Sequence, residues 1–241
     1  MKNMGTIFDW GYIWKSLPEI LVYLPVTLEI ALSSMFFGLI LGLITALVKI
    51  YRIPVLKQFA ALYISFIRGT PLLVQIYLAY YGIPKVLEYM EIAYHWHLSV
   101  NNVAPIVFVV FACAVNLGAY LSETIRASIE SVDRGQVEAA YSIGMTTLQT
   151  MKRIILPQAL VVALPNFGNI FLSIIKDTSL AFIVSVVEIM GQAKIIGSRG
   201  LRFFEVYIAV SLIYWVVCVV FGKGISLLEE RLRKYERRAI G

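Results

Sequence analysis

The chain has 241 residues, of which 59% are hydrophobic and 15% are charged, so it is too apolar for an ordinary soluble domain. Its net charge of +6 comes from lysines and arginines spread between and after the apolar runs, which argues against a nucleic-acid partner. Cys113 and Cys218 both fall inside apolar runs, where a thiol packs as a small apolar side chain, so neither a disulfide nor a metal site is expected. The composition predicts an all-α integral membrane protein.

The N-terminal stretch, residues 1–20, is polar and aromatic. It lacks the short apolar core and small-residue cleavage site of a signal peptide, so no signal peptide is predicted. We expect this segment to lie outside the membrane, with Trp10, Tyr12 and Trp14 near the membrane interface.

Five apolar runs follow, each near the length of roughly 20 residues that a transmembrane helix needs. The expected spans are residues 21–48, 59–81, 103–121, 158–187 and 206–226. In the first, Gly38 and Gly42 lie one turn apart and would let another helix pack closely. Residues 21–226 are therefore predicted to form one transmembrane domain, and residues 227–241 a charged tail.

Basic residues are unequally distributed between the two sides of these spans. The turn 49–57, the polar insert 122–156 and the segment 223–241 share one side and carry three, four and six lysines and arginines, against six on the other side. Because cytoplasmic segments are enriched in Lys and Arg, the insert and the C-terminus are predicted to be cytoplasmic and the N-terminus to lie outside. The basic tail is then expected to act as a lipid-facing retention signal.

The polar insert predicts two short helices joined by a turn. Asp133 and Gln136 form a capping-box pattern that starts a helix ending at Ile143. The dipeptide Ala139-Ala140 would give this helix a flat face that another protein can approach closely. Gly144 suits the left-handed residue that ends a helix.

The second helix of the insert is predicted over residues 147–156. Thr146 and Gln149 again form a capping-box pattern. Pro157 cannot continue the hydrogen-bond ladder unchanged, so we expect a break there before the fourth span. A bent helical pair of this kind would act as a lever, since pushing one arm moves the other.

The second apolar run holds an arginine, Arg68, near its middle. An arginine at bilayer depth costs about 2.5–3.5 kcal/mol on insertion scales, so Arg68 should face a cavity or a partner. Gly69 and Pro71 weaken the helix beside it. The guanidinium could hold a substrate carboxylate in bidentate fashion. The alternatives are a structural ion pair with Asp177 or Glu29, or a span boundary that leaves Arg68 at the cytoplasmic surface.

The fourth run is interrupted by Lys176 and Asp177, which point about 100° apart on a helix and cannot both be hidden from lipid by one neighbour. A zwitterionic substrate needs charges of both signs, which Arg68 and Asp177 would supply. Neutral hydrogen-bonding side chains complete the candidate substrate-binding set: Thr70, Gln75 and Ser179. The alternative is that Lys176 and Asp177 mark a kink stabilised by local pairing.

Other chemistry is scarce. No phosphate-binding loop occurs, since the segment 222–224 lacks the preceding glycine and the hydroxyl residue, so this chain is not expected to hydrolyse ATP. His95 and His97 with Glu91 fall on an external loop without cysteines, where solvated side chains are more plausible than metal ligands. No catalytic residue, cofactor or metal is predicted for this chain.

The residues of the insert resemble a known motif. The EAA motif of permease subunits of bacterial binding-protein-dependent ABC importers is matched by Glu138, Ala139, Ala140, Gly144, Ile154, Leu156 and Pro157. Residues 68–75, RGTPLLVQ, and 176–180, KDTSL, further resemble the branch that imports polar amino acids of the histidine, glutamine and cystine type.

This resemblance, over roughly residues 21–232, implies the type I importer permease fold, with five transmembrane helices and a cytoplasmic coupling helix-turn-helix. It implies a second permease copy or a paralogue, ABC ATPase subunits that bind ATP and Mg and dock on the loop 122–157, and an extracellular or periplasmic substrate-binding protein. The predicted function is ATP-driven import of a polar amino acid, of the cystine or glutamine type, across the cytoplasmic membrane. The motif residues would couple the permease to the ATPase.

Two other functions remain open from the sequence. An ATP-independent secondary carrier or channel would have inverted repeats, and none is visible. A membrane scaffold or sensor would keep the helical pair but would not need Arg68 and Asp177 at membrane depth.

Overall fold

The computed structural model describes residues 8–94 and 103–240, and within them every regular element is helical. The elements are α1 Trp10–Leu21, α2 Leu24–Ile50, α3 Leu56–Gly69, α4 Leu72–Tyr77, η1 Leu78–Gly82, α5 Ile83–Tyr94, α6 Pro105–Glu130, α7 Arg134–Ser142, α8 Thr147–Thr150, η2 Met151–Ile155, α9 Leu156–Asp177, η3 Thr178–Val184, α10 Ile189–Gly200 and α11 Phe203–Ile240. The all-α prediction is confirmed for this part of the chain.

Four helical runs among the described residues are long and apolar enough to cross a membrane. They are Leu24–Ile50, Pro105–Glu130, Thr147–Val184 and Phe203–Leu232. A fifth crossing is obtained when α3 and the run from α4 to α5 are counted as one broken span. The structure therefore agrees with five spans, one of which is interrupted.

Several helices continue beyond the predicted apolar runs. The helix α6 reaches Glu130 and α11 reaches Ile240, past the predicted ends at 121 and 226. The added residues include many Glu, Arg, Lys and Leu, which favour helix in water as well as in lipid. Hydropathy thus locates the lipid-embedded part of a helix but not its end. Short helices, α1 and α10, also form outside the spans.

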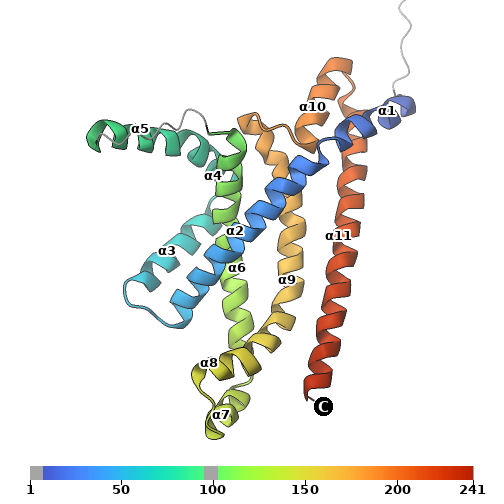
Figure 1. Cartoon of the computed structure of the whole chain (residues 1–241). Coiled ribbons are helices and arrows are strands. Elements are labelled where there is room, and N and C mark those ends of the chain that lie inside the picture. The colour runs from blue at the N-terminus through green and yellow to red at the C-terminus, as the bar shows by residue number, and fades with distance from the viewer. Residues whose placement is uncertain (1–7, 95–102, 241) are drawn as a thin grey trace, which may run out of the picture. The chain divides into compact units, whose positions relative to one another are not determined.

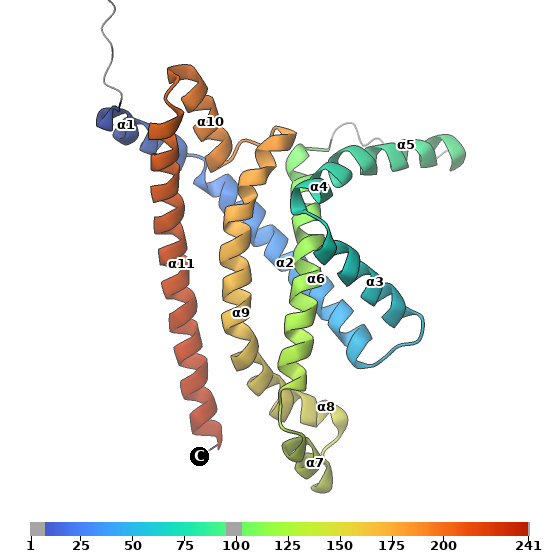
Figure 2. The ribbon, with the colours of Figure 1, turned by 180° about the vertical axis from the view of Figure 1, so that it is seen from behind.

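The chain divides into two compact units. Unit 1 comprises residues 1–34, 72–113 and 173–220, and unit 2 comprises residues 35–71, 114–172 and 221–241. In unit 1, α1 packs beside α10 (Figure 2). In unit 2, α7 packs against α8 and η2, next to the ends of α6 and α9 (Figure 1).

Glycines allow α2 and α6 to pack closely in unit 2. A Cβ added to Gly38 would lie 2.8 Å from Leu117 Cβ, and one added to Gly42 would lie 2.9 Å from Leu121 Cβ. Gly118 of α6 allows the same close approach, because a Cβ added there would lie 2.9 Å from Leu41 Cβ of α2. The predicted close packing at Gly38 and Gly42 is confirmed, and α6 is the partner helix.

Ion pairs join the same two helices near their ends. Lys49 Nζ of α2 pairs with Glu123 of α6. Arg126 donates from Nη2 to Glu123 at 2.8 Å and from Nη1 to Glu130 at 2.6 Å. Four charges therefore neutralise one another where α2 and α6 end.

Candidate functional site

The predicted helical pair of the polar insert forms. Asp133 Oδ1 accepts a hydrogen bond from the Gln136 N–H at 3.3 Å and caps α7. The capping box of α8 is complete, since the Gln149 N–H donates to Thr146 Oγ1 at 3.3 Å and the Thr146 N–H donates to Gln149 Oε1 at 2.8 Å. Gly144 lies between the helices with φ of +83°, as the sequence predicts.

A side-chain contact that the sequence did not predict ties α7 to α9. Gln158 Nε2 donates to Gln136 Oε1 at 2.6 Å and to the Ile154 carbonyl at 3.0 Å. The Gln136 side chain therefore binds the start of α9 while its N–H is capped by Asp133. The only sequence signal is a polar residue, Gln158, directly after Pro157 in an otherwise apolar run.

The break expected at Pro157 does not occur. The chain runs from α8 through the π-helical turn η2 into α9, and residues 147–184 form one continuous 38-residue helical run. Pro157 occupies the first turn of α9, directly after η2. A π-turn bonds residues five apart, so the local ladder is already rearranged where the proline N–H is missing. Movement of α7 would therefore act on a continuous helix.

The motif residues divide into exposed and buried ones. Glu138, Ala139 and Gly144 are exposed, Ile154 is half-buried and Leu156 is 43% exposed. Ala140 is only 4% exposed, so the prediction that both alanines form an outer face is wrong for Ala140. Because α7 packs against α8 and η2, one side of this short helix is covered, and Ala140 lies on that side.

Exposed apolar side chains of the helical pair were missed by the sequence analysis. Tyr141, Ile143 and Leu148 are 46%, 80% and 64% exposed. Large apolar groups left open on a polar element are typical of a surface that a partner protein covers. The signal in the sequence is their position on both sides of Gly144, away from any buried stripe.

Arg68 lies in the last turn of α3, at the interruption of the second span. Its guanidinium carbon lies 5.3 Å from the centroid of the Tyr120 ring of α6, in a cation–π contact. Tyr63 also fixes α3 to α6, because its hydroxyl donates to the Val115 carbonyl at 2.6 Å. Within unit 2 as described, Arg68 makes no ion pair, and pairing with Asp177 or Glu29 stays a prediction.

Thr70 stands in the interruption itself. Its backbone is extended, with φ of −121° and ψ of 145°. Its Oγ1 donates to the Phe66 carbonyl at 2.9 Å, so the hydroxyl satisfies a carbonyl at the open end of α3.

The other candidate substrate-binding residues belong to unit 1. Gln75 of α4 is 6% exposed, Asp177 is the exposed last residue of α9, and Ser179 is half-buried in η3. The helix ends at Asp177 by tightening into the 3₁₀ turn η3, and Lys176 forms no ion pair with Asp177 in the described unit. Arg68 and Thr70 belong to unit 2, so the assignment of all five residues to one substrate site stays a prediction. His95 and His97 lie outside the described residues.

A fully buried carboxylate in unit 1 was not predicted. Glu188 is the N-cap of α10 and accepts hydrogen bonds from the Gly191 N–H at 2.9 Å, Thr27 Oγ1 at 3.3 Å and the Tyr214 hydroxyl at 3.0 Å. It thereby joins α2, α10 and α11. Burial raises the pKa of this carboxyl, and the hydrogen bonds oppose that rise. Glutamate is an unusual N-cap, so the sequence gave no capping signal here.

Residues 38–234 match the family described as "Binding-protein-dependent transport system inner membrane component". The probable amino-acid ABC transporter permease protein PatM of Vibrio harveyi is 44% identical, over 94% of this chain and 97% of that protein. The L-cystine transport system permease protein TcyL of Bacillus subtilis is 42% identical, over 98% and 97%. The glutamine transport system permease protein GlnP of Escherichia coli is 30% identical, over 94% and 98%.

Solved structures agree with these relatives. The crystal structure of an amino acid ABC transporter with histidines contains a chain 36% identical to this one, with a TM-score of 0.80, covering 94% of this chain and 100% of that chain. A chain of the methionine ABC transporter MetNI in an inward-facing conformation, 13% identical with a TM-score of 0.69 over 93% and 99%, supports the fold alone. The predicted importer permease fold is confirmed. This chain belongs to the binding-protein-dependent transport system inner membrane component family and is a permease subunit of an ABC importer.

Proposed function

We propose that this permease moves a polar amino acid, of the cystine or glutamine type, driven by separate ATPase subunits that dock on the pair α7–α8. The observation that carries the coupling is the construction of this pair. Each helix is capped by a side chain, Gly144 forms the left-handed turn, and Gln136 fastens the pair to α9 through Gln158.

The amino-acid substrate is supported by the relatives and by chemistry. One relative is described as a permease for L-cystine and another as a permease for glutamine. Arg68 offers a cation for a substrate carboxylate and Asp177 an anion for a substrate ammonium group. Thr70, Gln75 and Ser179 offer neutral hydrogen-bonding groups.

The ATPase contact is supported by what α7 and α8 expose. Glu138 and Ala139 present a carboxylate and a small side chain, while Tyr141, Ile143 and Leu148 add apolar area. An ATPase covering this surface would bind ATP and Mg itself and would push on α7. The contacts of α7 with α8 and η2, and the Gln136–Gln158 hydrogen bond, would pass that displacement to α9.

The assembly would contain further partners. A binding protein outside the cell or in the periplasm would deliver the substrate, and a second permease copy or a paralogue would complete the pathway. The excess of Lys and Arg on the side of α7–α8 supports an orientation in the cytoplasmic membrane with the C-terminus inside and the N-terminus outside.

Uptake of labelled cystine and labelled glutamine into proteoliposomes tests this function. The vesicles would contain the permease with its cognate ATPase, ATP inside and the binding protein outside. We expect one of the two amino acids to be taken up, and this uptake to require the ATPase, ATP and the binding protein together. Uptake without the ATPase, driven by an ion gradient, would instead identify a secondary carrier, and absence of uptake with a fully assembled complex would favour a scaffold or sensor.

A further inference from the structure

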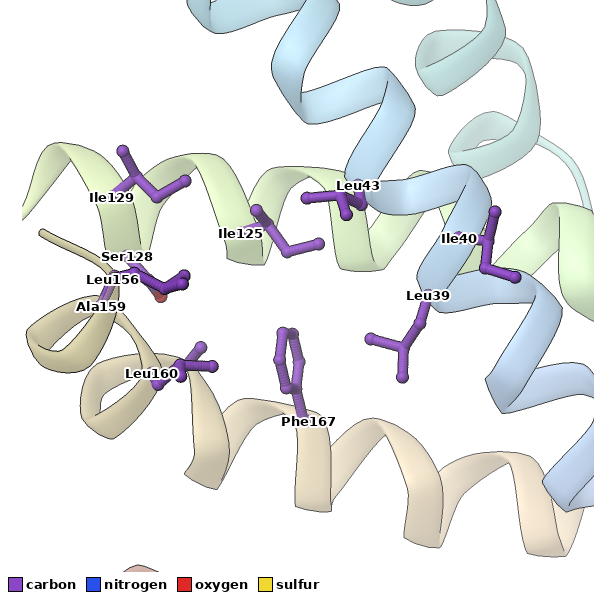
Figure 3. Close-up of a pocket in the computed structure, with 11 residues that line it drawn as sticks. Leu39, Ile40, Leu43, Ile125, Ser128, Ile129, Leu156, Ala159, Leu160 and Phe167 are labelled. Carbon is purple, nitrogen blue, oxygen red and sulfur yellow. The ribbon is translucent and has the colours of Figure 1, made fainter. Parts of the chain in front are cut away.

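Unit 2 contains an apolar cavity of about 320 Å³ between α2, α6 and α9. Figure 3 shows side chains from all three helices around it, with the Phe167 ring projecting into the space from α9. The lining includes Leu39 and Leu43 of α2, Ile129 of α6, and Leu160 of α9. Ser128 is the one polar residue among the described residues that line it.

The cavity is open to the surroundings of the unit. Of its lining residues, Ile40, Leu43 and Leu160 are 43%, 47% and 45% exposed. All three helices are among the runs apolar enough to cross a membrane. An open apolar space between such helices suits an apolar occupant better than water, which would find almost no hydrogen-bonding partner in it.

Two cations stand close in the chain to a residue that lines the cavity. Lys152 and Arg153 are exposed residues of η2, and they precede the lining residue Leu156 by four and three positions. Residues four to five apart lie on one face of a π-turn, so Lys152 lies on the face of Leu156. Neither cation forms an ion pair with any described residue.

Two other basic residues near this end of unit 2 are already neutralised. Lys49 pairs with Glu123, and Arg126 pairs with both Glu123 and Glu130. Lys152 and Arg153 form no such pair, so both keep their positive charge next in the chain to the apolar opening. An apolar slot with cations at its membrane-surface end has the chemistry of a lipid with an anionic head group.

We propose that this cavity is a binding site for an anionic phospholipid, with one acyl chain between α2, α6 and α9 and the phosphate paired with Lys152 and Arg153. The proposal needs only a membrane-embedded permease and holds whichever amino acid is transported. It places a lipid beside η2, the turn that joins the proposed ATPase-docking pair to α9.

Photocrosslinking from within the cavity tests the proposal. Phe167 would be replaced by p-benzoylphenylalanine in the full permease–ATPase complex, reconstituted in mixed vesicles of phosphatidylglycerol and phosphatidylcholine. After irradiation, intact mass would identify the adduct. We expect phosphatidylglycerol adducts roughly ten- to thirtyfold above the share of that lipid in the bilayer, the preference that two surface cations provide.

Paired variants separate the two parts of the site. Lys152→Gln with Arg153→Gln should reduce the preference for phosphatidylglycerol to near parity. Arg52→Gln with Lys57→Gln removes the same charge from exposed positions in the turn after α2 and at the start of α3, and should leave the preference unchanged. Ala163→Phe should block all lipid adducts by filling the cavity. Val162→Phe, at a 48% exposed neighbour that does not line the cavity, should not.

Three results would overturn the proposal. Equal labelling by the two lipids would show that the cavity does not select an anionic head group. A main adduct to a second permease or to the ATPase would show that protein covers the cavity. An unchanged preference for phosphatidylglycerol after loss of Lys152 and Arg153 would show that these cations do not bind the head group. This test does not depend on whether the Ala163→Phe variant folds.

Discussion

Glu188 shows how a single residue of this permease holds a carboxyl group inside a packed unit. Its side chain is fully buried, and its two oxygens accept hydrogen bonds from two side-chain hydroxyls and one backbone N–H. Such bonds offset the cost of removing a carboxylate from water. Because each donor belongs to a different helix, the carboxylate also fixes α10 between α2 and α11.

Replacing Glu188 should destabilise unit 1 in proportion to the donors that lose their acceptor. Glu188→Ala removes the acceptor of the Thr27 hydroxyl, the Tyr214 hydroxyl and the Gly191 N–H, and we expect a loss of about 1–3 kcal/mol in the free energy of unfolding. Glu188→Gln keeps one acceptor oxygen and should lose less. Thermal unfolding of the purified permease in detergent measures both, and equal melting temperatures for Ala and Gln would contradict the role of the hydrogen bonds.

The raised pKa of Glu188 also predicts a pH dependence of stability. Since the folded carboxyl binds its proton more tightly than the unfolded one, whose pKa is 4.5, its contribution is fully present below pH 4.5 and is lost as pH rises through the raised value. The melting temperature of the wild type relative to Glu188→Gln should therefore fall as pH is raised from about 4 to 7. A difference that stays constant over this range would show that burial does not shift this pKa.

Arg68 is the residue on which the substrate prediction depends most. Loss of a charge-assisted hydrogen bond of about 1.5–3 kcal/mol should raise the substrate concentration for half-maximal uptake roughly ten- to hundredfold in Arg68→Ala, with the complex still assembled. Tyr120→Phe keeps the ring under the guanidinium and should transport normally. If Arg68→Ala takes up substrate as well as the wild type does, Arg68 does not bind the substrate. Its role would then be the structural contact with Tyr120.

At the scale of elements, the pair α7–α8 contains both contacts that short-range sequence predicts and contacts that it does not predict. The caps at Asp133 and Thr146 and the left-handed turn at Gly144 depend on residues at most three positions apart, and all three were predicted. The Gln136–Gln158 bond joins residues 22 positions apart, so it depends on how α7 packs on η2 and has no local signature. The continuous helix through Pro157 was missed for a similar reason, since a π-turn leaves no periodic pattern of its own.

The Gln136–Gln158 bond should contribute to coupling rather than to assembly. We expect Gln158→Leu to keep ATPase binding but to lower the number of amino acids transported per ATP hydrolysed, by roughly the five- to tenfold that corresponds to one lost hydrogen bond. Gln149→Leu, which breaks only the capping box of α8, serves as a matched control. ATP hydrolysis and uptake measured in the same proteoliposomes give this ratio. An unchanged ratio in Gln158→Leu would assign the bond to stability alone.

At the scale of the whole molecule, hydropathy predicted the number of spans but not where a span is interrupted or how the helices pack. A long apolar run such as residues 24–50 forms an unbroken helix in lipid, because every backbone N–H and C=O group must then be hydrogen-bonded within the segment. The interruption after Gly69 and the division of the long helices between two units depend on packing that composition does not encode. For that reason the local turns around the motif could be predicted from sequence, whereas the contacts of the substrate-binding set could not.

The orientation predicted from basic residues can be measured directly. In a permease with Cys113 and Cys218 replaced by serine, single cysteines would be introduced as Ser142→Cys in α7 and Lys85→Cys in α5. A membrane-impermeant maleimide added to intact cells should label Lys85→Cys, and should label Ser142→Cys only after the membrane is opened. The reverse pattern would place α7 outside and exclude docking of a cytoplasmic ATPase there.

The early end of α3 has a consequence for where water can reach. With 14 residues, α3 is about 21 Å long, shorter than the roughly 30 Å of a hydrocarbon core. Lipid tails offer no partner to the carbonyls that an α-helix leaves open at its end, and in α3 the Thr70 hydroxyl satisfies the Phe66 carbonyl. A helix that ends within the predicted span needs polar neighbours or water around its end, and the same surroundings would serve the charge of Arg68 at the depth that the sequence predicts.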